Sequence, residues 1–291
     1  MGFIMLTNME KLLAVANKHN FAVPAFNIAD WGMCRGVFEI AEQKKAPFII
    51  NIHPNELKLL GREIMKAVIE LAHNSFLPVA INLDHGLSQE QIIMAIQAGY
   101  TSVMIDGSHL PFAENSKLCR EIVRLAHAAG VSVEGELGTI GSADKEAESG
   151  NPIIFTHPDD AAKFVQETGI DALAIAIGTS HGLYPKGFVP KLDLDLLKKI
   201  KDKVSVPLVL HGGSDNNDNE IAEAVNLGIN KINISSDIKA AYYKKMRELM
   251  QDESIRNPTT ATPPCVEAMK EVAAHKIDLF RTGDKVSLFC C

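Results

Sequence analysis

The chain has 291 residues, of which 46% are hydrophobic and 22% charged, and its formal net charge is −7. This acidic balance argues against nucleic-acid binding, and no apolar run approaches the roughly 18–20 residues of a membrane span. The five cysteines are scattered and odd in number, which is typical of free thiols in a reducing compartment. The composition therefore predicts a cytoplasmic globular protein. It leaves a phosphorylated ligand open, because backbone amides and a metal ion can bind phosphate.

Short apolar runs alternate with amphipathic helical stretches along the chain. A helix over residues 6–20 comes first and is expected to cap the bottom of the fold. The apolar runs that follow are rich in Val, Ile, Leu and Ala, as strands covered on both faces of a parallel sheet are. The predicted strands are residues 21–26, 47–52, 79–83, 102–105, 132–137, 172–177, 207–210 and 231–234.

The predicted helices are residues 33–44, 64–74, 89–98, 113–129, 159–168, 195–203, 220–227 and 236–250. Eight strand–helix units indicate the α/β class and close most naturally into a (β/α)8 TIM barrel, so we expect one domain over residues 1–291. The alternative is an open doubly wound sheet, but residues 27–30 lack its glycine-rich fingerprint. Residues after about 252 are expected to form a C-terminal helical appendage with a helix near 266–275.

Polar side chains fall where each predicted strand ends. They are Asn27, Asn51, His53, Asp84, His85, Asp106, Glu136, His181, His211 and Asn233. In a TIM barrel the carboxyl ends of the strands form the face that carries the active site. One such residue is readily a satisfied core group, but a polar residue at the end of every strand predicts a functional rim.

Three of these rim residues are histidines on different strands: His85, His181 and His211. A single histidine is more often a hydrogen-bonded or surface side chain than a ligand. Three neutral imidazoles that converge with an open position are typical of catalytic zinc, although cobalt and manganese stay open. The sequence therefore predicts one catalytic divalent metal.

A second pattern indicates phosphate binding. Gly182 follows His181, Gly212-Gly213-Ser214 follows His211, and Ser235-Ser236 opens the last helix. Glycine lets backbone N–H groups approach an anion, and the loops after strands seven and eight are the usual phosphate site of these barrels. Turn glycines and a serine helix cap are the simpler interpretation of each feature taken alone.

Six motifs together resemble the class II (zinc-dependent) ketose-bisphosphate aldolases, closest to the tagatose-bisphosphate branch. They are Ala25-Phe26-Asn27, Asn82-Leu83-Asp84-His85-Gly86, Glu134-Gly135-Glu136-Leu137-Gly138, Gly178-Thr179-Ser180-His181-Gly182, Leu210-His211-Gly212-Gly213-Ser214 and Lys231-Ile232-Asn233-Ile234. They occur in order from the first strand to the eighth, so the resemblance covers nearly the whole chain.

The resemblance implies a role for each matching residue. Asp84 would be the acid/base at the hydroxyl group of the bond that is cleaved. The implied zinc ligands are His85, His181 and His211, with Glu136 as an alternative ligand. The implied substrate and phosphate contacts are Asn27, Gly182, Gly212, Gly213, Ser214, Asn233, Ser235 and Ser236. It further implies a sodium or potassium ion near the phosphate and a homodimer or homotetramer.

Three positions depart from the family pattern. Asn82 stands where the family usually has histidine, two residues before Asp84. The family's glutamate that moves the enediolate proton aligns with Asp144, although Glu146 lies close by. Pro185 precedes Lys186, where many relatives place the lysine directly after tyrosine, so the contact to a second phosphate is in doubt.

The expected reaction is reversible cleavage of a tagatose- or fructose-type ketose 1,6-bisphosphate to dihydroxyacetone phosphate and glyceraldehyde 3-phosphate. The alternative substrate is a ketose 1-phosphate or sugar-acid phosphate that yields a non-phosphorylated aldehyde. A non-catalytic partner subunit is a different class of function, and it predicts that loss of His211 is tolerated. A metal-dependent hydrolase fits less well, because the first strand ends Ala25-Phe26-Asn27 without the usual histidine pair.

Overall fold

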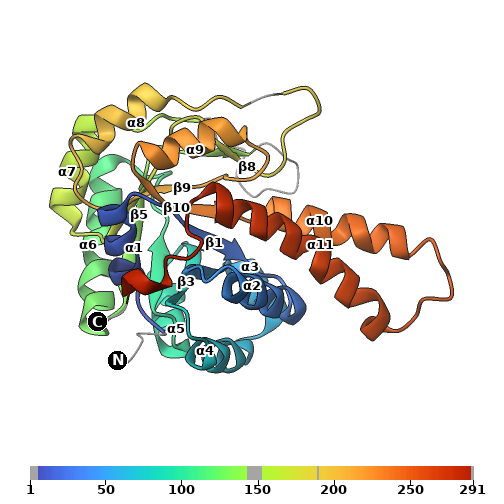
Figure 1. Ribbon diagram of the computed structural model, residues 1–291. Helices are drawn as coiled ribbons and strands as arrows, with labels where there is room; N and C mark the ends of the chain where they lie inside the picture. The colour runs from blue at the N-terminus through green and yellow to red at the C-terminus, as the bar shows by residue number, and fades with distance from the viewer. Residues whose placement is uncertain (1–5, 143–152, 189, 290–291) are drawn as a thin grey trace.

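The computed structural model describes residues 6–142, 153–188 and 190–289, and its centre is a closed barrel of eight parallel strands (Figure 1). The strands follow one another around the barrel in the order β1-β10-β9-β7-β5-β4-β3-β2. Their bounds are β1 Val23–Asn27, β2 Phe48–Ile52, β3 Val79–Gly86, β4 Ser102–Ile105, β5 Ser132–Leu137, β7 Ala172–Ile175, β9 Leu208–Leu210 and β10 Ile229–Ile234. The predicted (β/α)8 TIM barrel is confirmed.

Helices cover the outside of the barrel. Their bounds are α1 Met9–His19, α2 Trp31–Gln43, α3 Pro54–Leu60, α4 Ile64–Asn74, α5 Gln89–Ala98, α6 Phe112–Ala128, α7 Pro158–Thr168, α8 Leu194–Lys201, α9 Asp218–Asn226, α10 Ser236–Leu249 and α11 Pro258–Leu279, followed by the 3₁₀ turn η1 Val286–Phe289. All the predicted helices are present, and α3 was not predicted. Within the part of the chain that the structure describes, no helix combines the length and apolar character needed to cross a lipid bilayer.

The strands are buried on both faces, which is why their sequences are apolar runs. Phe26 and Ile50 pack outward into the large core beneath the helices, whereas Ala25 and Ile49 face the barrel interior. Helix α1 closes that interior with Met9, Leu12, Leu13 and Ala16. The Met9 amide donates hydrogen bonds to Ser102 Oγ (2.8 Å) and Ser132 Oγ (3.1 Å). The predicted capping helix is confirmed, and it leaves the opposite end of the barrel open for a site.

The C-terminal appendage is an antiparallel pair of helices, α10 and α11, that projects from one side of the barrel (Figure 1). Helix α11 has 22 residues and buries Cys265, Met269, Ala273 and Ile277, each four positions from the next. It begins before the predicted segment, since the helix also includes Pro263 and Pro264. Prolines ordinarily end a helix, since they lack an N–H group, but here packing against α10 and α2 supports the turn.

A small parallel sheet that the sequence did not predict lies beside the carboxyl ends of the strands. Strand β6 (Gly141–Ser142) pairs with β8 (Ser180–His181), residue 141 with 180 and 142 with 181. This sheet joins the loop after β5 to the loop after β7. It gives His181 a regular backbone conformation although His181 lies beyond its barrel strand.

Candidate functional site

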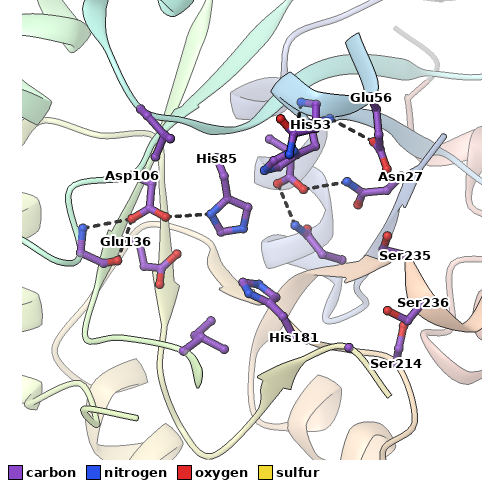
Figure 2. A pocket seen from close by; sticks show the side chains of 18 of the residues that line it. Asn27, His53, Glu56, His85, Asp106, Glu136, His181, Ser214, Ser235 and Ser236 are labelled. Atoms are coloured by element: carbon purple, nitrogen blue, oxygen red, sulfur yellow. Dashed lines mark hydrogen bonds and ion pairs between the residues drawn. The ribbon is translucent and has the colours of Figure 1, made fainter. Parts of the chain in front are cut away.

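A cavity of about 560 Å³ opens at the carboxyl ends of the barrel strands. The residues that were predicted for the site and that line it are Asn27, Asp84, His85, Glu136, His181, Gly182, Gly212, Ser214, Asn233, Ser235 and Ser236. His53, Glu56, Asp106 and Lys239 also line it. Figure 2 shows His85, Asp106 and Glu136 on one side of the pocket and Ser214, Ser235 and Ser236 on the other.

Asp84 and His85 reach the same cavity although they are neighbours on one strand. Consecutive strand residues ordinarily point to opposite faces. Here the pairing of β3 with β4 shifts register between Leu83 and Gly86, and His85 has a φ of 48°, in the left-handed region. This bulge turns the His85 ring toward the cavity, and such backbone conformations concentrate at functional sites.

The three predicted histidines converge. The ring centroids of His85 and His211 are 4.7 Å apart, those of His85 and His181 are 5.0 Å apart, and those of His181 and His211 are 5.9 Å apart. One nitrogen from each ring lies within 4.8 Å of the others. His211 is fully buried, whereas His85 and His181 line the cavity.

Carboxylates hold the far side of two of these rings. Asp106 Oδ2 lies 2.9 Å from His85 Nδ1, a bond drawn in Figure 2, and Glu134 Oε1 lies 2.7 Å from His211 Nε2. A carboxylate on one ring nitrogen places the N–H there and leaves the other nitrogen as a lone-pair ligand. Those other nitrogens, His85 Nε2 and His211 Nδ1, are 3.0 Å apart. Two ring nitrogens this close need a proton or a metal ion between them, so the arrangement is compatible with a bound metal.

Glu136 lies beside the same point. It is 2% exposed, its Oε2 is 3.8 Å from His211 Nδ1, and that oxygen accepts no hydrogen bond from the described residues. Burial and the neighbouring Asp106 raise its pKa well above the ordinary value. His85, Asp106 and Glu136 also form a group with metal-ligand spacing. The structure therefore places Glu136 where an alternative ligand was expected.

Of the three histidine rings, His85 is the one that carries a positive charge. Burial alone would lower the pKa of His85, but Asp84 and the Asp106 hydrogen bond outweigh it and raise that pKa to about 10. Burial lowers the pKa of His181 to about 3, and the positive His85 contributes to the shift. A divalent cation on these rings would replace the proton of His85, so metal binding should weaken as the pH falls.

Asp84 is held from two sides. Asn27 Nδ2 donates to its Oδ2 at 2.8 Å, and Asn233 Nδ2 donates to its Oδ1 at 3.0 Å. Although burial raises its pKa, the charges of His85 and His211 outweigh this and hold it below the ordinary aspartate range. Asp84 is therefore an ionised carboxylate whose orientation at the cavity wall is fixed by two asparagine amides.

The opposite wall has the features expected of a phosphate site. Ser235 and Ser236 stand at the start of α10, where the helix dipole gives partial positive charge. The Ser214 hydroxyl accepts a hydrogen bond from the Asp237 amide at 3.2 Å, which ties the loop after β9 to this helix start. Gly212 has a φ of 62°, and a Cβ there would lie 2.4 Å from the Ser180 carbonyl oxygen. Only glycine fits this turn.

Gly213 was predicted with these phosphate contacts but stands behind them. It is absent from the described lining of the cavity, and its N–H donates to the Asn233 carbonyl at 3.2 Å. A Cβ on Gly213 would lie 2.3 Å from Ile232 Cγ2. The glycine allows the loop to approach β10 closely.

Asp144 and Glu146, the two candidates for the enediolate proton, lie outside the described residues. Lys186 is described and is not among the lining residues. The preceding Tyr184 accepts a hydrogen bond from the Ser180 amide (2.7 Å) through its hydroxyl and donates one from its own amide to Asp215 Oδ2 (2.9 Å). Tyr184 therefore braces the loop that carries His181.

Two buried charges were not proposed as site residues from the sequence. Lys231 Nζ lies 2.6 Å from Glu134 Oε2, and both side chains are 0% exposed. β10 begins at Ile229, so Lys231 lies inside the strand, two residues before Asn233 and on the same face. Glu134 likewise precedes Glu136 by two residues on β5. The sequence signal for such buried ion pairs is a charged residue two positions before a rim residue on an otherwise apolar strand, because residues two apart point to the same face.

Comparison with known proteins agrees with the motif resemblance. The sequence matches the family model for fructose-bisphosphate aldolase class-II over residues 7–285. The solved structure of the YdjI aldolase from Escherichia coli K12 is 35% identical, with a TM-score of 0.87 over 97% of this chain and 100% of that chain. A putative fructose-1,6-biphosphate aldolase from Coccidioides immitis is 28% identical, with a TM-score of 0.89 over 97% and 98% of the two chains.

A fructose-bisphosphate aldolase (Fba) from Campylobacter jejuni is 23% identical, with a TM-score of 0.81 over 96% and 97% of the chains, and supports the barrel fold. The family match includes every element from α1 to α11. The chain is therefore an aldolase and belongs to the class II fructose-bisphosphate aldolase family.

Proposed function

We propose that the protein catalyses zinc-dependent, reversible aldol cleavage of a ketose phosphate that yields dihydroxyacetone phosphate. The observation that carries the proposal is Asp84, held by two asparagines at the cavity wall beside three convergent histidines. For a tagatose- or fructose-type 1,6-bisphosphate the second product is glyceraldehyde 3-phosphate. The family supports aldol cleavage in general, and the site geometry supports the residue roles.

Each group has a defined task. Zinc held by His85, His181 and His211, with Glu136 as alternative ligand, would supply Lewis-acid stabilisation of the oxygens on carbons 2 and 3. Asp84 accepts the proton of the carbon-4 hydroxyl, the bond between carbons 3 and 4 breaks, and its electron pair stays on carbon 3. Asp144 or Glu146 is proposed to supply the proton that carbon 3 then takes. In condensation each proton moves back.

The phosphate of the dihydroxyacetone half is proposed to bind at the α10 start. Its proposed contacts are Gly182, Gly212, Ser214, Asn233, Ser235 and Ser236, with Asn27 nearer the reacting carbons. A monovalent cation beside this phosphate, one domain across the chain and a homodimer or homotetramer stay predictions of the family resemblance.

An ion pair one turn along α10 from Ser235 favours a second candidate substrate. Lys239 is the one described lining residue with a permanent positive charge, and its ammonium group is ion-paired with Glu56 Oε1. Glu56 is 9% exposed, and its Oε2 accepts the His53 amide at 3.1 Å. A second phosphate here would meet a carboxylate that already neutralises the lysine. This supports a ketose 1-phosphate or sugar-acid phosphate that releases a non-phosphorylated aldehyde.

A substrate panel tests the proposal. Ketose 1-phosphates and 1,6-bisphosphates are assayed for release of dihydroxyacetone phosphate, after removal of metal with EDTA and after return of zinc. We expect cleavage that EDTA abolishes and zinc restores, and loss of bound zinc in His211→Ala but not in the exposed His73→Ala control. Failure of the zinc-loaded enzyme to cleave any member of the panel would reject the proposal and favour a non-catalytic role.

The Glu56 pair distinguishes the two substrates. Glu56→Gln keeps the hydrogen bond to the His53 amide but leaves Lys239 unpaired. We expect the kcat/KM ratio to move toward the bisphosphate by about tenfold, which corresponds to ~1.4 kcal/mol. Asp159→Asn removes an equivalent ion pair with Lys203 on the surface and should leave the ratio unchanged. An unchanged ratio in Glu56→Gln would place the second phosphate elsewhere.

A further inference from the structure

Three buried asparagines stand side by side on the first three strands of the barrel. Asn27 of β1 pairs in register with Asn51 of β2, and Asn51 pairs with Asn82 of β3. The three residues are 4%, 0% and 0% exposed, respectively. Strand residues in register point to the same face of a sheet, so the three amides form one layer inside the barrel.

The amides form a chain of hydrogen bonds that ends on Asp84. Asn82 Nδ2 donates to Asn51 Oδ1 at 3.0 Å, and Asn51 Nδ2 donates to Asn27 Oδ1 at 3.4 Å. Asn27 Nδ2 then donates to Asp84 Oδ2 at 2.8 Å. Asn27, Asn51 and Asn82 are called the asparagine ladder below.

The carboxylate sets the direction of the whole ladder. An ionised carboxylate only accepts hydrogen bonds, whereas an amide donates at its nitrogen and accepts at its oxygen. Asn27 must therefore turn its nitrogen to Asp84 and its oxygen to Asn51, and Asn51 must repeat the pattern toward Asn82. The aligned amide dipoles polarise one another and direct positive potential at the carboxylate. At the far end, Asn82 Oδ1 accepts no hydrogen bond from the described residues.

Asn51 and Asn82 act at a distance from the substrate. Neither is among the described residues that line the cavity, whereas Asn27 and Asp84 are. A buried acceptor without a partner costs free energy, and an apolar side chain at Asn82 would avoid that cost. The ladder is therefore better explained by the orientation that it imposes on Asn27 than by stability.

We propose that Asn51 and Asn82 are positioning residues for proton transfer at Asp84. They hold the Asn27 amide with its nitrogen toward Oδ2 of Asp84, which orients the carboxylate that accepts the carbon-4 hydroxyl proton. The inference rests on the proposed aldol cleavage. It assigns a task to the amide that replaces the family's usual histidine at Asn82.

The proposed reaction includes two proton transfers, and only one of them needs Asp84. Measuring both therefore distinguishes a positioning role of Asn51 and Asn82 from a merely structural role. Cleavage needs Asp84 to accept a proton from oxygen. Exchange of the carbon-3 hydrogen of dihydroxyacetone phosphate with deuterated water needs only the group that acts on carbon. Damage to the ladder should therefore slow cleavage and spare exchange.

The experiment measures both reactions in the zinc-loaded enzyme and its variants. In Asn51→Leu we expect kcat for cleavage to fall ~10- to 100-fold, the loss typical of a displaced reacting group, while KM and the exchange rate stay within about twofold. Asn82→Leu should show a smaller loss of the same kind, and Asn82→His, which restores an N–H donor, should recover cleavage. Asn230→Leu removes a buried asparagine of β10 that donates to the Phe21 carbonyl at 3.4 Å, and should change neither rate.

Each outcome decides the inference. Cleavage and exchange that fall together, or neither falling, would overturn the positioning role. If Asn51→Leu does not fold, the comparison of Asn82→Leu with Asn82→His decides alone by the same criterion. A wild-type enzyme that neither cleaves nor exchanges would instead overturn the proposed function.

Discussion

His85 Nε2 lies 3.0 Å from His211 Nδ1, although the other nitrogen of each ring is already bonded to a carboxylate. Asp106 and Glu134 thus decide which nitrogens of the two rings face each other, and Lys231 in turn holds Glu134. Two of the three candidate metal ligands are therefore held by carboxylates: His85 by Asp106, and His211 by Glu134. The geometry of His211 thus depends on Glu134 and Lys231, which are not among the described residues that line the cavity.

The Lys231 ion pair is expected to support both stability and metal binding. Among the described residues, Lys231→Met leaves the buried Glu134 carboxylate with His211 as its remaining side-chain partner. Removal of one member of a buried pair typically costs ~3–5 kcal/mol, because the other charge stays buried. Urea unfolding should show this loss, and zinc titration should show weaker binding. Lys203→Met, which removes a surface ion pair with Asp159, is the control and should change the free energy of unfolding by less than ~1 kcal/mol.

The same pair predicts how stability depends on pH in the metal-free protein. Burial raises the pKa of Glu134, but Lys231 and His211 outweigh it and lower the pKa below 4.5. A carboxyl group whose pKa is lower in the folded state stabilises above its unfolded pKa, and this contribution is lost as the pH falls through the folded value. The free energy of unfolding should therefore decrease below about pH 4.5, and by less in Glu134→Gln. Equal acid sensitivity in the two proteins would contradict this assignment.

Asp84 is expected to act in catalysis and not in metal retention. Asp84→Asn keeps the size of the side chain but cannot accept a proton, so kcat for cleavage should fall ~10²–10⁴-fold. Zinc content, measured by atomic absorption, should stay at the wild-type level because the three histidines are unchanged. A variant that loses its zinc would show that Asp84 supports the ligands instead.

The turn at Gly212 offers a matched pair of glycine substitutions. Gly212→Ala combines a positive φ of 62° with a Cβ only 2.4 Å from the Ser180 carbonyl oxygen, whereas Gly130 has a φ of 73° and no described heavy atom within 4 Å of the point where a Cβ would stand. Both variants carry the left-handed backbone cost of ~1–2 kcal/mol. Only Gly212→Ala should also raise the KM for a phosphorylated substrate, because the loop must move. Similar KM values for the two variants would separate Gly212 from substrate binding.

The rim residues could be predicted from the sequence because each follows an apolar run of recognisable length. Parallel strands bring their carboxyl ends to one face, so Asp84, His181 and His211 were expected to meet before any contact was known. The carbon–carbon lyase chemistry followed from the same motifs.

Interactions between strands could not be predicted in this way. The asparagine ladder depends on the register of β1, β2 and β3, and the Lys231–Glu134 pair depends on two strands on different sides of the barrel interior. Short elements were also missed. Helix α3 was missed because it has only seven residues. Its start is nevertheless marked in the sequence, by Pro54 after His53 and by Glu56.

The left-handed backbone at His85 means that a substitution there alters two properties at once. Alanine removes the ring and keeps the strain of a φ of 48°, whereas glycine removes the ring and releases that strain. His85→Gly should consequently melt at a higher temperature than His85→Ala, by the equivalent of about 1 kcal/mol, although both lose the same proposed metal ligand. At residue 85 the backbone is therefore strained, and this strain accompanies the orientation of the His85 imidazole toward the cavity.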